Sequence, residues 1–204
     1  MTLALKPGLT LYFARHGQTE ANLHKQFSGM KDTPLTPLGR EQAKEVGDIL
    51  AETLGLQPMT VDFVCSPLQR AKTTMSIVRE VLGLPHDGFR TDPRLQEIDL
   101  GIWDQLTDAE ARALDPAFFE RRTNDKWNVR IPEGESYADV AKRIESFCHD
   151  IARDTFIVSH GATTRILRGL FAGLSAQQMS ALDEPQGVVF CARGNVVTRL
   201  DPDA

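Results

Sequence analysis

Three short apolar segments, each ending abruptly at a basic or His-Gly motif, are the strongest constraint on how this chain can fold. They cover residues 11–14, 61–65 and 155–158, and their composition is typical of buried strands. Segments with a helical spacing of apolar residues lie between them, without repeats or low-complexity tracts. This alternation predicts an α/β protein built around one sheet.

Two helix starts share one capping signal. Thr36-Pro37 places an N-cap residue before a proline at the first helical position, and apolar residues then keep a helical spacing up to a stop at Gly55. Ser66-Pro67 repeats the signal, and the predicted helix runs to Gly83. Arg70 then lies in the first turns of that helix, close to the end of the second strand.

A second pair of helices brackets the third strand. Ser136 and Asp139 resemble a capping box ahead of a helix that leads into this strand. The helix predicted after His160 begins at Gly161, and its first amides should lie beside His160 and favour an anion. Further along, the sequence predicts a helix over residues 161–171 and two strands joined by a turn over residues 187–192 and 196–200.

The strand ends bring two histidines and two arginines toward one place. Ligands of open α/β sheets bind beyond the carboxyl ends of the strands, so Arg15, His16, Arg70 and His160 should share one cleft. Guanidinium groups suit phosphate oxygens, and a neutral histidine can act as a nucleophile. The positive charge should lower the pKa of His16, whereas a bound phosphate should raise the pKa of a nearby carboxyl group. Glu97 is the candidate for that general acid.

Length and charge limit the classes of function. With 204 residues, 41% of them hydrophobic, the chain fits a single domain over residues 1–204. A net charge of -5 argues against binding to nucleic acid or an anionic membrane surface. We expect neither a signal peptide nor a membrane helix, since the latter needs about 20 apolar residues. The scattered Cys65, Cys148 and Cys191 favour reduced thiols in a cytoplasmic protein over a disulfide frame or metal site.

Several motifs, in order, resemble those of one enzyme family. Together they look like the signature of the histidine phosphatase superfamily, the phosphoglycerate mutase-like clan, and more specifically its phosphatase branch. This resemblance implies a three-layer sandwich with a mostly parallel central sheet flanked by helices. The motifs are Arg15-His16-Gly17-Gln18-Thr19-Glu20-Ala21-Asn22, Asp32-Thr33-Pro34-Leu35-Thr36-Pro37-Leu38-Gly39, Ser66-Pro67-Leu68-Gln69-Arg70-Ala71-Lys72-Thr73, Leu95-Gln96-Glu97-Ile98-Asp99-Leu100-Gly101-Ile102-Trp103, Pro132-Glu133-Gly134-Glu135-Ser136 and Val158-Ser159-His160-Gly161.

The resemblance also implies a mechanism. His16 would attack phosphorus, Glu97 would protonate the leaving group, and water would then hydrolyse the phosphohistidine without a metal or other cofactor. The phosphoryl oxygens would be held by Arg15, Arg70 and His160, and Asn22 and Gly161 would belong to the substrate-binding set. Taken singly, each of these residues also has a structural interpretation, as an ion-pair partner, a helix cap or a turn residue.

The chain departs from the family pattern after Trp103. Asp104-Gln105 stands where the phosphatase branch usually has an acidic residue followed by glycine. We therefore expect a local difference in the loop beside Glu97.

A basic segment bears on the choice of substrate. Residues 104–134 are expected to form a lid over the phosphate pocket, and Arg121, Arg122, Lys126 and Arg130 lie within it. These side chains form either a solvated charged surface or a site for a second anionic group. Cofactor-dependent phosphoglycerate mutases carry an Arg-Arg pair in the comparable region, which places Arg121 and Arg122 among the candidate substrate-binding residues.

The function that we expect is hydrolysis of a small phosphorylated metabolite through phospho-His16. The segment Phe27-Ser28-Gly29-Met30 is more similar to the broad phosphatase branch, which includes sugar-phosphate and α-ribazole phosphatases, than to the mutases. The alternatives are a cofactor-dependent phosphoglycerate mutase and a non-catalytic protein that binds a phosphorylated ligand. The expected partner is the small-molecule phosphate ester, and the sequence is compatible with a homodimer.

Overall fold

A mostly parallel sheet forms the centre of the computed structural model, which describes residues 3–55 and 60–201. Within these ranges the sheet has the strand order β3-β2-β4-β1-β5-β6. The first four strands of this order pair in parallel, and β5 and β6 pair antiparallel at one edge. The strands are β1 (Thr10–Arg15), β2 (Asp62–Cys65), β3 (Arg90–Thr91), β4 (Thr155–Ser159), β5 (Val189–Arg193) and β6 (Val196–Leu200).

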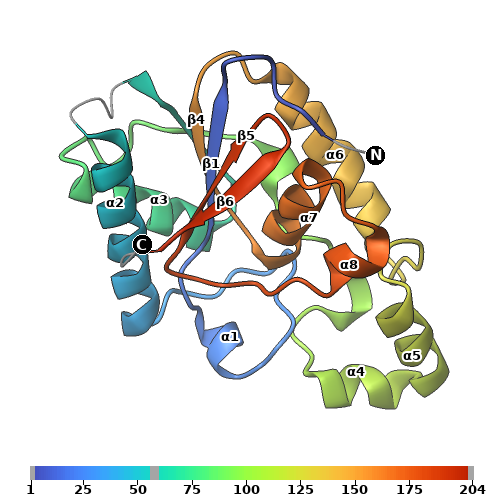
Figure 1. The fold of residues 1–204 in the computed structure, drawn as a ribbon. Helices are drawn as coiled ribbons and strands as arrows, with labels where there is room; N and C mark the ends of the chain where they lie inside the picture. Colours follow the sequence, from blue (N-terminus) through green and yellow to red (C-terminus); the bar gives the residue numbers. More distant parts are fainter. Residues whose placement is uncertain (1–2, 56–59, 202–204) are drawn as a thin grey trace.

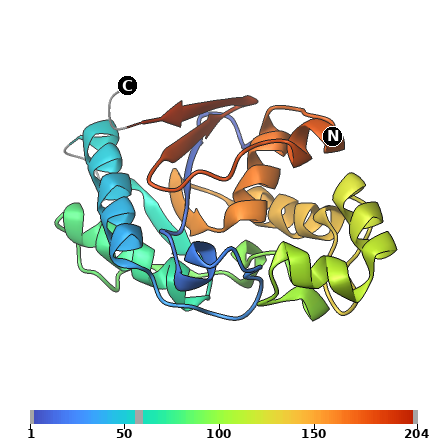
Figure 2. The same cartoon turned by 90° about the horizontal axis from the view of Figure 1, so that it is seen from below.

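Two pairs of long helices cover the two faces of the sheet (Figures 1 and 2). α2 (Pro37–Leu54) packs against α3 (Gln69–Val81) on one face. α6 (Tyr137–Asp150) packs against α7 (Gly161–Phe171) on the other face. The expected three-layer α/β sandwich is therefore confirmed.

The two cores follow from the alternation of side chains along each strand. In β1, Leu11 and Phe13 join the core beneath α6 and α7, whereas Tyr12 and Ala14 join the core beneath α2 and α3. All four are buried, as expected for a strand covered on both faces. The apolar run before Arg15 therefore anchors that residue at the end of a rigid central strand.

Shorter elements lie around the carboxyl edge of the sheet. The expected lid segment contains two helices, and Trp103 at its base packs against the rings of Phe118 and Phe119 at 5.6 and 5.3 Å between centroids. Movement of this segment stays a prediction. The elements are α1 (Glu20–Leu23), η2 (Pro93–Leu95), η3 (Gly101–Trp103), α4 (Asp108–Leu114), α5 (Pro116–Asn124) and α8 (Ala176–Ser180).

One helix start differs from the sequence expectation. α3 begins at Gln69 rather than directly after Ser66-Pro67, and its N-cap residue makes no side-chain capping bond. The carboxylate of Asp32 accepts the amides of Gln69 and Arg70 instead, at 2.6 and 3.3 Å. A distant residue thus caps this helix, and Ser66 accepts a hydrogen bond from the Leu68 amide in the preceding turn.

The domain expectation reaches slightly beyond the described residues. Residues 1–2, 56–59 and 202–204 of the expected 1–204 domain lie outside them. Among the helices that the structure describes, none combines the length and apolar character needed to cross a membrane.

Candidate active site

The candidate catalytic residues meet where β1 and β4 end side by side. Arg15 lies opposite Ser159 in the parallel pair, so His16 and His160 leave the sheet together. Their ring centroids are 5.1 Å apart. Arg70, from the first turn of α3, reaches both rings, with its Nε 3.3 Å from Nε2 of His16 and 3.2 Å from Nδ1 of His160. All three of these side chains are buried.

The hydrogen bonds of His16 define its tautomer. Its Nδ1 lies 2.8 Å from the carbonyl oxygen of Gly17. Because a carbonyl only accepts, Nδ1 carries the proton and Nε2 carries the lone pair. Burial lowers the pKa of His16 well below 6.5, and the charges of Arg70 and Arg15 lower it further. The imidazole is therefore neutral near pH 7, with the nitrogen that faces Arg70 free to attack an electrophile.

His160 presents a buried donor. Its Nδ1 accepts the hydrogen bond from Arg70, so its proton lies on Nε2. This Nε2 is buried and has no hydrogen-bond partner in the described part of the chain. Burial, followed by the charge of Arg70, lowers the pKa of His160 well below 6.5. An unpaired buried donor is costly, and an oxygen of a bound phosphoryl group would satisfy it.

The two arginines have different surroundings. Arg70 uses its terminal nitrogens on Asp32 and on carbonyl oxygens of the 28–31 loop, which leaves only the Nε hydrogen that it shares between the histidines. Arg15 donates from Nη1 to the carbonyl oxygen of Glu184 at 2.7 Å, while its buried Nε has no partner among the described residues. Arg15 therefore keeps a donor for an incoming phosphoryl group, whereas Arg70 would have to turn its Nε hydrogen from the histidines to the phosphoryl oxygens.

Glu97 occupies the amino-terminal end of α7. Its carboxyl oxygens accept hydrogen bonds from the amides of Ala162 and Thr163 at 3.2 and 3.3 Å, and from the Ile98 amide at 2.9 Å. The amides expected to hold an anion beside His160 thus hold this carboxyl group. Burial raises the pKa of Glu97, and the neighbouring charge of Glu184 raises it further. A raised pKa suits a general acid that works near neutral pH.

The structure also places the two remaining substrate-binding candidates of the first motif and α7. Asn22 lines the pocket, accepts a hydrogen bond from the Thr19 amide within a capping box, and lies 3.3 Å from the amide nitrogen of Gln186. Gly161 is buried at the start of α7, where a Cβ would approach Oε2 of Glu184 to 2.6 Å. Their contact with substrate stays a prediction.

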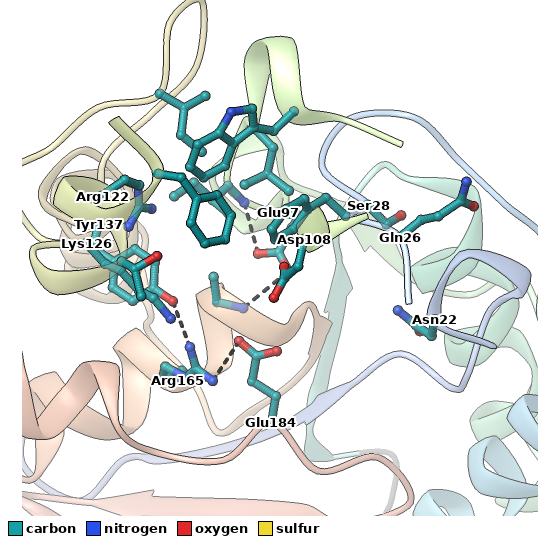
Figure 3. A pocket seen from close by; sticks show the side chains of 18 of the residues that line it. Asn22, Gln26, Ser28, Glu97, Asp108, Arg122, Lys126, Tyr137, Arg165 and Glu184 are labelled. Carbon is teal, nitrogen blue, oxygen red and sulfur yellow. Dashed lines mark hydrogen bonds and ion pairs between the residues drawn. The ribbon is translucent and has the colours of Figure 1, made fainter. Parts of the chain in front are cut away.

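A pocket of about 410 Å³ is lined by His16 and by side chains of α4 and α5. Figure 3 shows side chains that line it. Arg122, Lys126 and Arg165 gather at one end of it with Tyr137, whose hydroxyl lies 2.8 Å from Nη1 of Arg165. Burial lowers the pKa of Lys126, and the nearby charge of Arg165 lowers it further. Aromatic rings form part of the wall, namely Phe27, Trp103, Phe119 and Tyr137.

The two adjacent arginines of α5 lie in different environments. Arg122 lines the pocket, is buried, and has an Nε without a partner among the described residues. Arg121 is exposed, stacks over the ring of Phe118 at 5.1 Å, and is not among the residues that line the pocket. The structure thus brings only one member of the pair to the site.

Comparison with known proteins assigns the family. The model of the histidine phosphatase superfamily (branch 1) matches residues 11–190. The chain belongs to this superfamily. It is 31% identical to the human protein 6-phosphofructo-2-kinase/fructose-2,6-bisphosphatase 4, over 86% of this chain and 35% of that protein. The chain thus spans about a third of the length of these curated relatives.

Other relatives match along most of their length. The Enterobacter sp. (strain 638) protein named "Probable phosphoglycerate mutase GpmB" is 32% identical over 82% of this chain and 77% of that protein. The α-ribazole phosphatase structure from Shigella flexneri is 26% identical, with a TM-score of 0.79 and coverage of 95% and 96% of the two chains. A mycobacterial glucosyl-3-phosphoglycerate phosphatase structure is 28% identical, with a TM-score of 0.75 and coverage of 95% and 99%.

The sequence did not reveal every residue of the candidate site. Arg165 lies one helical turn after Gly161 on the same helix, a spacing that could have revealed it. Glu184 and Gln186 belong to the loop between α8 and β5, where no periodicity gives a signal. Gln186 nevertheless donates to the carbonyl oxygen of His16 at 2.9 Å.

The expected local difference after Trp103 has a defined structure. The carboxylate of Asp104 accepts the amides of Gly29, Met30 and Lys31 at 2.8 to 3.0 Å. Gln105 adopts a φ of 77°, the left-handed conformation that the glycine of the family pattern would take without strain. The loop therefore has a left-handed residue that is not glycine. Asp104 connects this loop to residues 28–31, whose carbonyl oxygens also accept hydrogen bonds from Arg70.

Proposed function

We propose that this chain is a phosphomonoesterase that forms a phosphohistidine on His16. The observation that carries the proposal is the buried, neutral imidazole of His16, whose Nε2 lone pair faces Arg70. Beside it lies the Nε2 donor of His160, which has no partner within residues 3–55 and 60–201. This arrangement combines a nucleophile with donors for the oxygens of a phosphoryl group. It also argues against a protein that only binds phosphorylated ligands, because binding alone does not need an oriented nucleophile.

In the proposed reaction, Nε2 of His16 attacks phosphorus while the bond to the ester oxygen breaks. Arg15, Arg70 and His160 donate to the phosphoryl oxygens and stabilise their charge. Protonated Glu97 gives its proton to the leaving oxygen. The resulting carboxylate then takes a proton from water, which attacks the phosphohistidine and releases orthophosphate.

The other end of the pocket supports a second anionic group on the substrate. Arg122, Lys126 and Arg165 are three cations in one pocket wall, and the buried Nε atoms of Arg122 and Arg165 have no partner in the part of the chain that the structure describes. A carboxylate or second phosphate would offset their mutual repulsion. Two relatives act, by their names, on fructose 2,6-bisphosphate and glucosyl-3-phosphoglycerate, and both of these compounds carry such a group.

A matched substrate pair tests the second anionic group. 3-Phosphoglycerate and glycerol 3-phosphate differ mainly by a carboxylate in place of a hydroxymethyl group. We expect kcat/KM to favour 3-phosphoglycerate, and Arg122→Gln to remove about 10-fold or more of that preference. Arg121→Gln is the control and should change neither value. A second pair is glucose 1,6-bisphosphate and glucose 1-phosphate. If kcat/KM favours the substrate with the second anionic group in neither pair, the proposed site for a second anion is wrong.

The mutase alternative is favoured by one observation, the pocket-lining Arg122 in a chain that is 32% identical to a mutase-named relative. Phosphorus NMR with 3-phosphoglycerate and a trace of 2,3-bisphosphoglycerate separates the two functions. Orthophosphate as the main product supports the phosphatase, whereas fast formation of 2-phosphoglycerate supports the mutase. Absence of both products sends the search to other phosphomonoesters, with His16→Ala as the inactive control.

The remaining features are part of the same proposal. The segment 104–134 would act as a lid because α4 and α5 carry pocket-lining side chains such as Asp108 and Arg122. A cytoplasmic location is supported by the three free cysteines. Limited proteolysis with and without an inhibitory oxyanion tests the lid, since closure should protect the segment from cleavage.

A further inference from the structure

The loop between α8 and β5 brings a carboxylate to the candidate active site. Oε1 of Glu184 lies 3.1 Å from Nη2 of Arg165, and Oε2 lies 3.8 Å from Nη1 of Arg15. The backbone oxygen of Glu184 also accepts a hydrogen bond from Arg15 at 2.7 Å. Glu184 therefore joins Arg15 of the phosphoryl site to Arg165 in the pocket wall. Figure 3 shows the ion pair between Glu184 and Arg165.

The start of α7 leaves room for this carboxylate. A Cβ on Gly161 would approach Oε2 and Cδ of Glu184 to 2.6 and 2.8 Å. The φ of Gly161 is not in the left-handed region, so the backbone alone does not require glycine here. Glycine at position 161 therefore leaves space for the carboxylate of Glu184 and is not required by a turn.

The same carboxylate lies among the charges around Glu97. Burial is the largest cause of the raised pKa of Glu97, and the charge of Glu184 is the next. Arg70 and Arg15 act in the opposite direction, as does the hydrogen bond from the Ile98 amide. The charged or titratable groups around Glu97 are Arg15 at the end of β1, His16 directly after it, Arg70 on α3, Tyr137 and Arg143 on α6, Arg165 on α7 and Glu184 on the loop.

We propose that Glu184 is a positioning residue, which holds Arg15 and Arg165 in place and sets a negative charge opposite the acid Glu97. The positive groups that bind phosphate would otherwise favour loss of the proton from Glu97 before substrate arrives. Glu184 offsets them without taking up the phosphoryl group itself. This inference rests on the proposed function, because it assigns Glu184 a role in keeping the general acid protonated.

The isosteric variant Glu184→Gln tests the proposal through the pH profile of kcat/KM. Two substrates are compared, glycerol 3-phosphate, whose alkoxide leaving group needs a proton, and p-nitrophenyl phosphate, which scarcely needs one. For glycerol 3-phosphate, we expect the alkaline limb of the profile to shift to lower pH by about one pH unit, because Glu97 loses its proton more readily without the charge of Glu184. For p-nitrophenyl phosphate, the alkaline limb should stay where it is.

Asp183→Asn is the matched control. Asp183 is the preceding residue, has a side chain that is 59% exposed, and pairs with Arg168 at 2.7 Å away from the pocket. Its neutralisation removes the same formal charge from the same loop and should leave both profiles unchanged. Gly161→Ala, which would displace the carboxylate of Glu184, should move the limb in the same direction as Glu184→Gln.

The outcomes separate this inference from the proposed function. Equal loss of activity on both substrates at every pH, without a shifted limb, would show that Glu184 is merely structural and overturn the inference. His16→Ala and Glu97→Gln belong to the same series of measurements. Retained turnover in His16→Ala, or an unchanged alkaline limb in Glu97→Gln, overturns the proposed function and the inference together. The alkaline limb can change in Glu97→Gln but stay unchanged in Glu184→Gln. That result overturns the role of Glu184 and leaves the proposed function intact.

Discussion

Arg70 donates a hydrogen bond from its Nε to Nε2 of His16 over 3.3 Å. The contact shows that the lone pair of the imidazole points at a buried cation, at the place where a phosphoryl group would bind. Because the guanidinium is also held by Asp32 and by carbonyl oxygens of the 28–31 loop, its position is fixed before substrate enters. The orientation of the nucleophile is therefore built into the free protein.

Replacement of the nucleophile is the most direct prediction. His16→Ala should lower kcat by at least about 1,000-fold, because it removes the nitrogen on which the proposed phosphoenzyme forms. The fold should persist, as judged by circular dichroism and by the melting temperature. Isolation of an acid-labile phosphoprotein from the wild type, but not from the variant, would support the assignment, and normal turnover of the variant would refute it.

The general acid should matter in proportion to the leaving group. We expect Glu97→Gln to slow the hydrolysis of glycerol 3-phosphate by about 100-fold or more, and that of p-nitrophenyl phosphate far less, when kcat/KM is measured. The reason is that an aryl oxide departs without a proton. Equal slowing of both substrates would remove Glu97 from the acid role.

The buried histidines should make stability depend on pH. In the unfolded chain, each imidazole gains a proton as the pH falls through its ordinary value of 6.5, whereas in the folded chain His16 and His160 stay neutral. The unfolded state then binds more protons, so the free energy of unfolding decreases below about pH 6.5, by up to about 1.4 kcal/mol per pH unit for each histidine.

Glu97 acts with the opposite sign. Its pKa is raised in the folded state, so the stability that its proton contributes is present below its ordinary value and is lost as the pH rises through the folded value. Urea unfolding from pH 5 to 8 checks the balance, with the variant His16→Asn/His160→Asn as control. That variant should show a flatter dependence on pH, and an unchanged slope would contradict the assignment of two neutral histidines.

The left-handed residue after Asp104 offers a stabilising substitution. Gln105→Gly should raise the free energy of unfolding by about 1 kcal/mol, because it relieves the strain at a φ of 77° and removes a buried amide nitrogen without a partner in the described residues. Urea unfolding measures the change. Glu133→Gly, at an exposed residue with a φ of 62°, is the comparison and should gain less. A net loss of stability in Gln105→Gly would refute the strain argument.

Local signals predicted the sheet and several helix limits well. The sequence limits 161–171 agree with those of α7, and the Thr36-Pro37 signal begins α2 as expected. Both follow from neighbouring residues, through capping and apolar spacing. Ser66-Pro67 carries the same signal but fails to begin α3, because Asp32, more than thirty residues away in the chain, takes the first amides of that helix. A local pattern cannot show that competition.

The same distinction holds for the site. His16, Arg70, Glu97 and His160 were predicted to meet because strand ends and family motifs specify their places, and the structure brings them together. Glu184 acts through contacts with residues far along the chain, so its loop gave no signal. Arg121 and Arg122 are adjacent in sequence, and only the direction of α5 decides which of them reaches the pocket.

The position of β4 has a consequence for biosynthesis. This strand pairs with β1 on one side and β2 on the other, although it is made about ninety residues after β2. His16 follows β1 and Arg70 lies on α3, just after β2. The nascent chain therefore has no pairing through the sheet between these two parts until β4 and His160 emerge from the ribosome. A polypeptide that stops before β4 therefore holds the first motif but lacks His160 and the strand that joins β1 to β2.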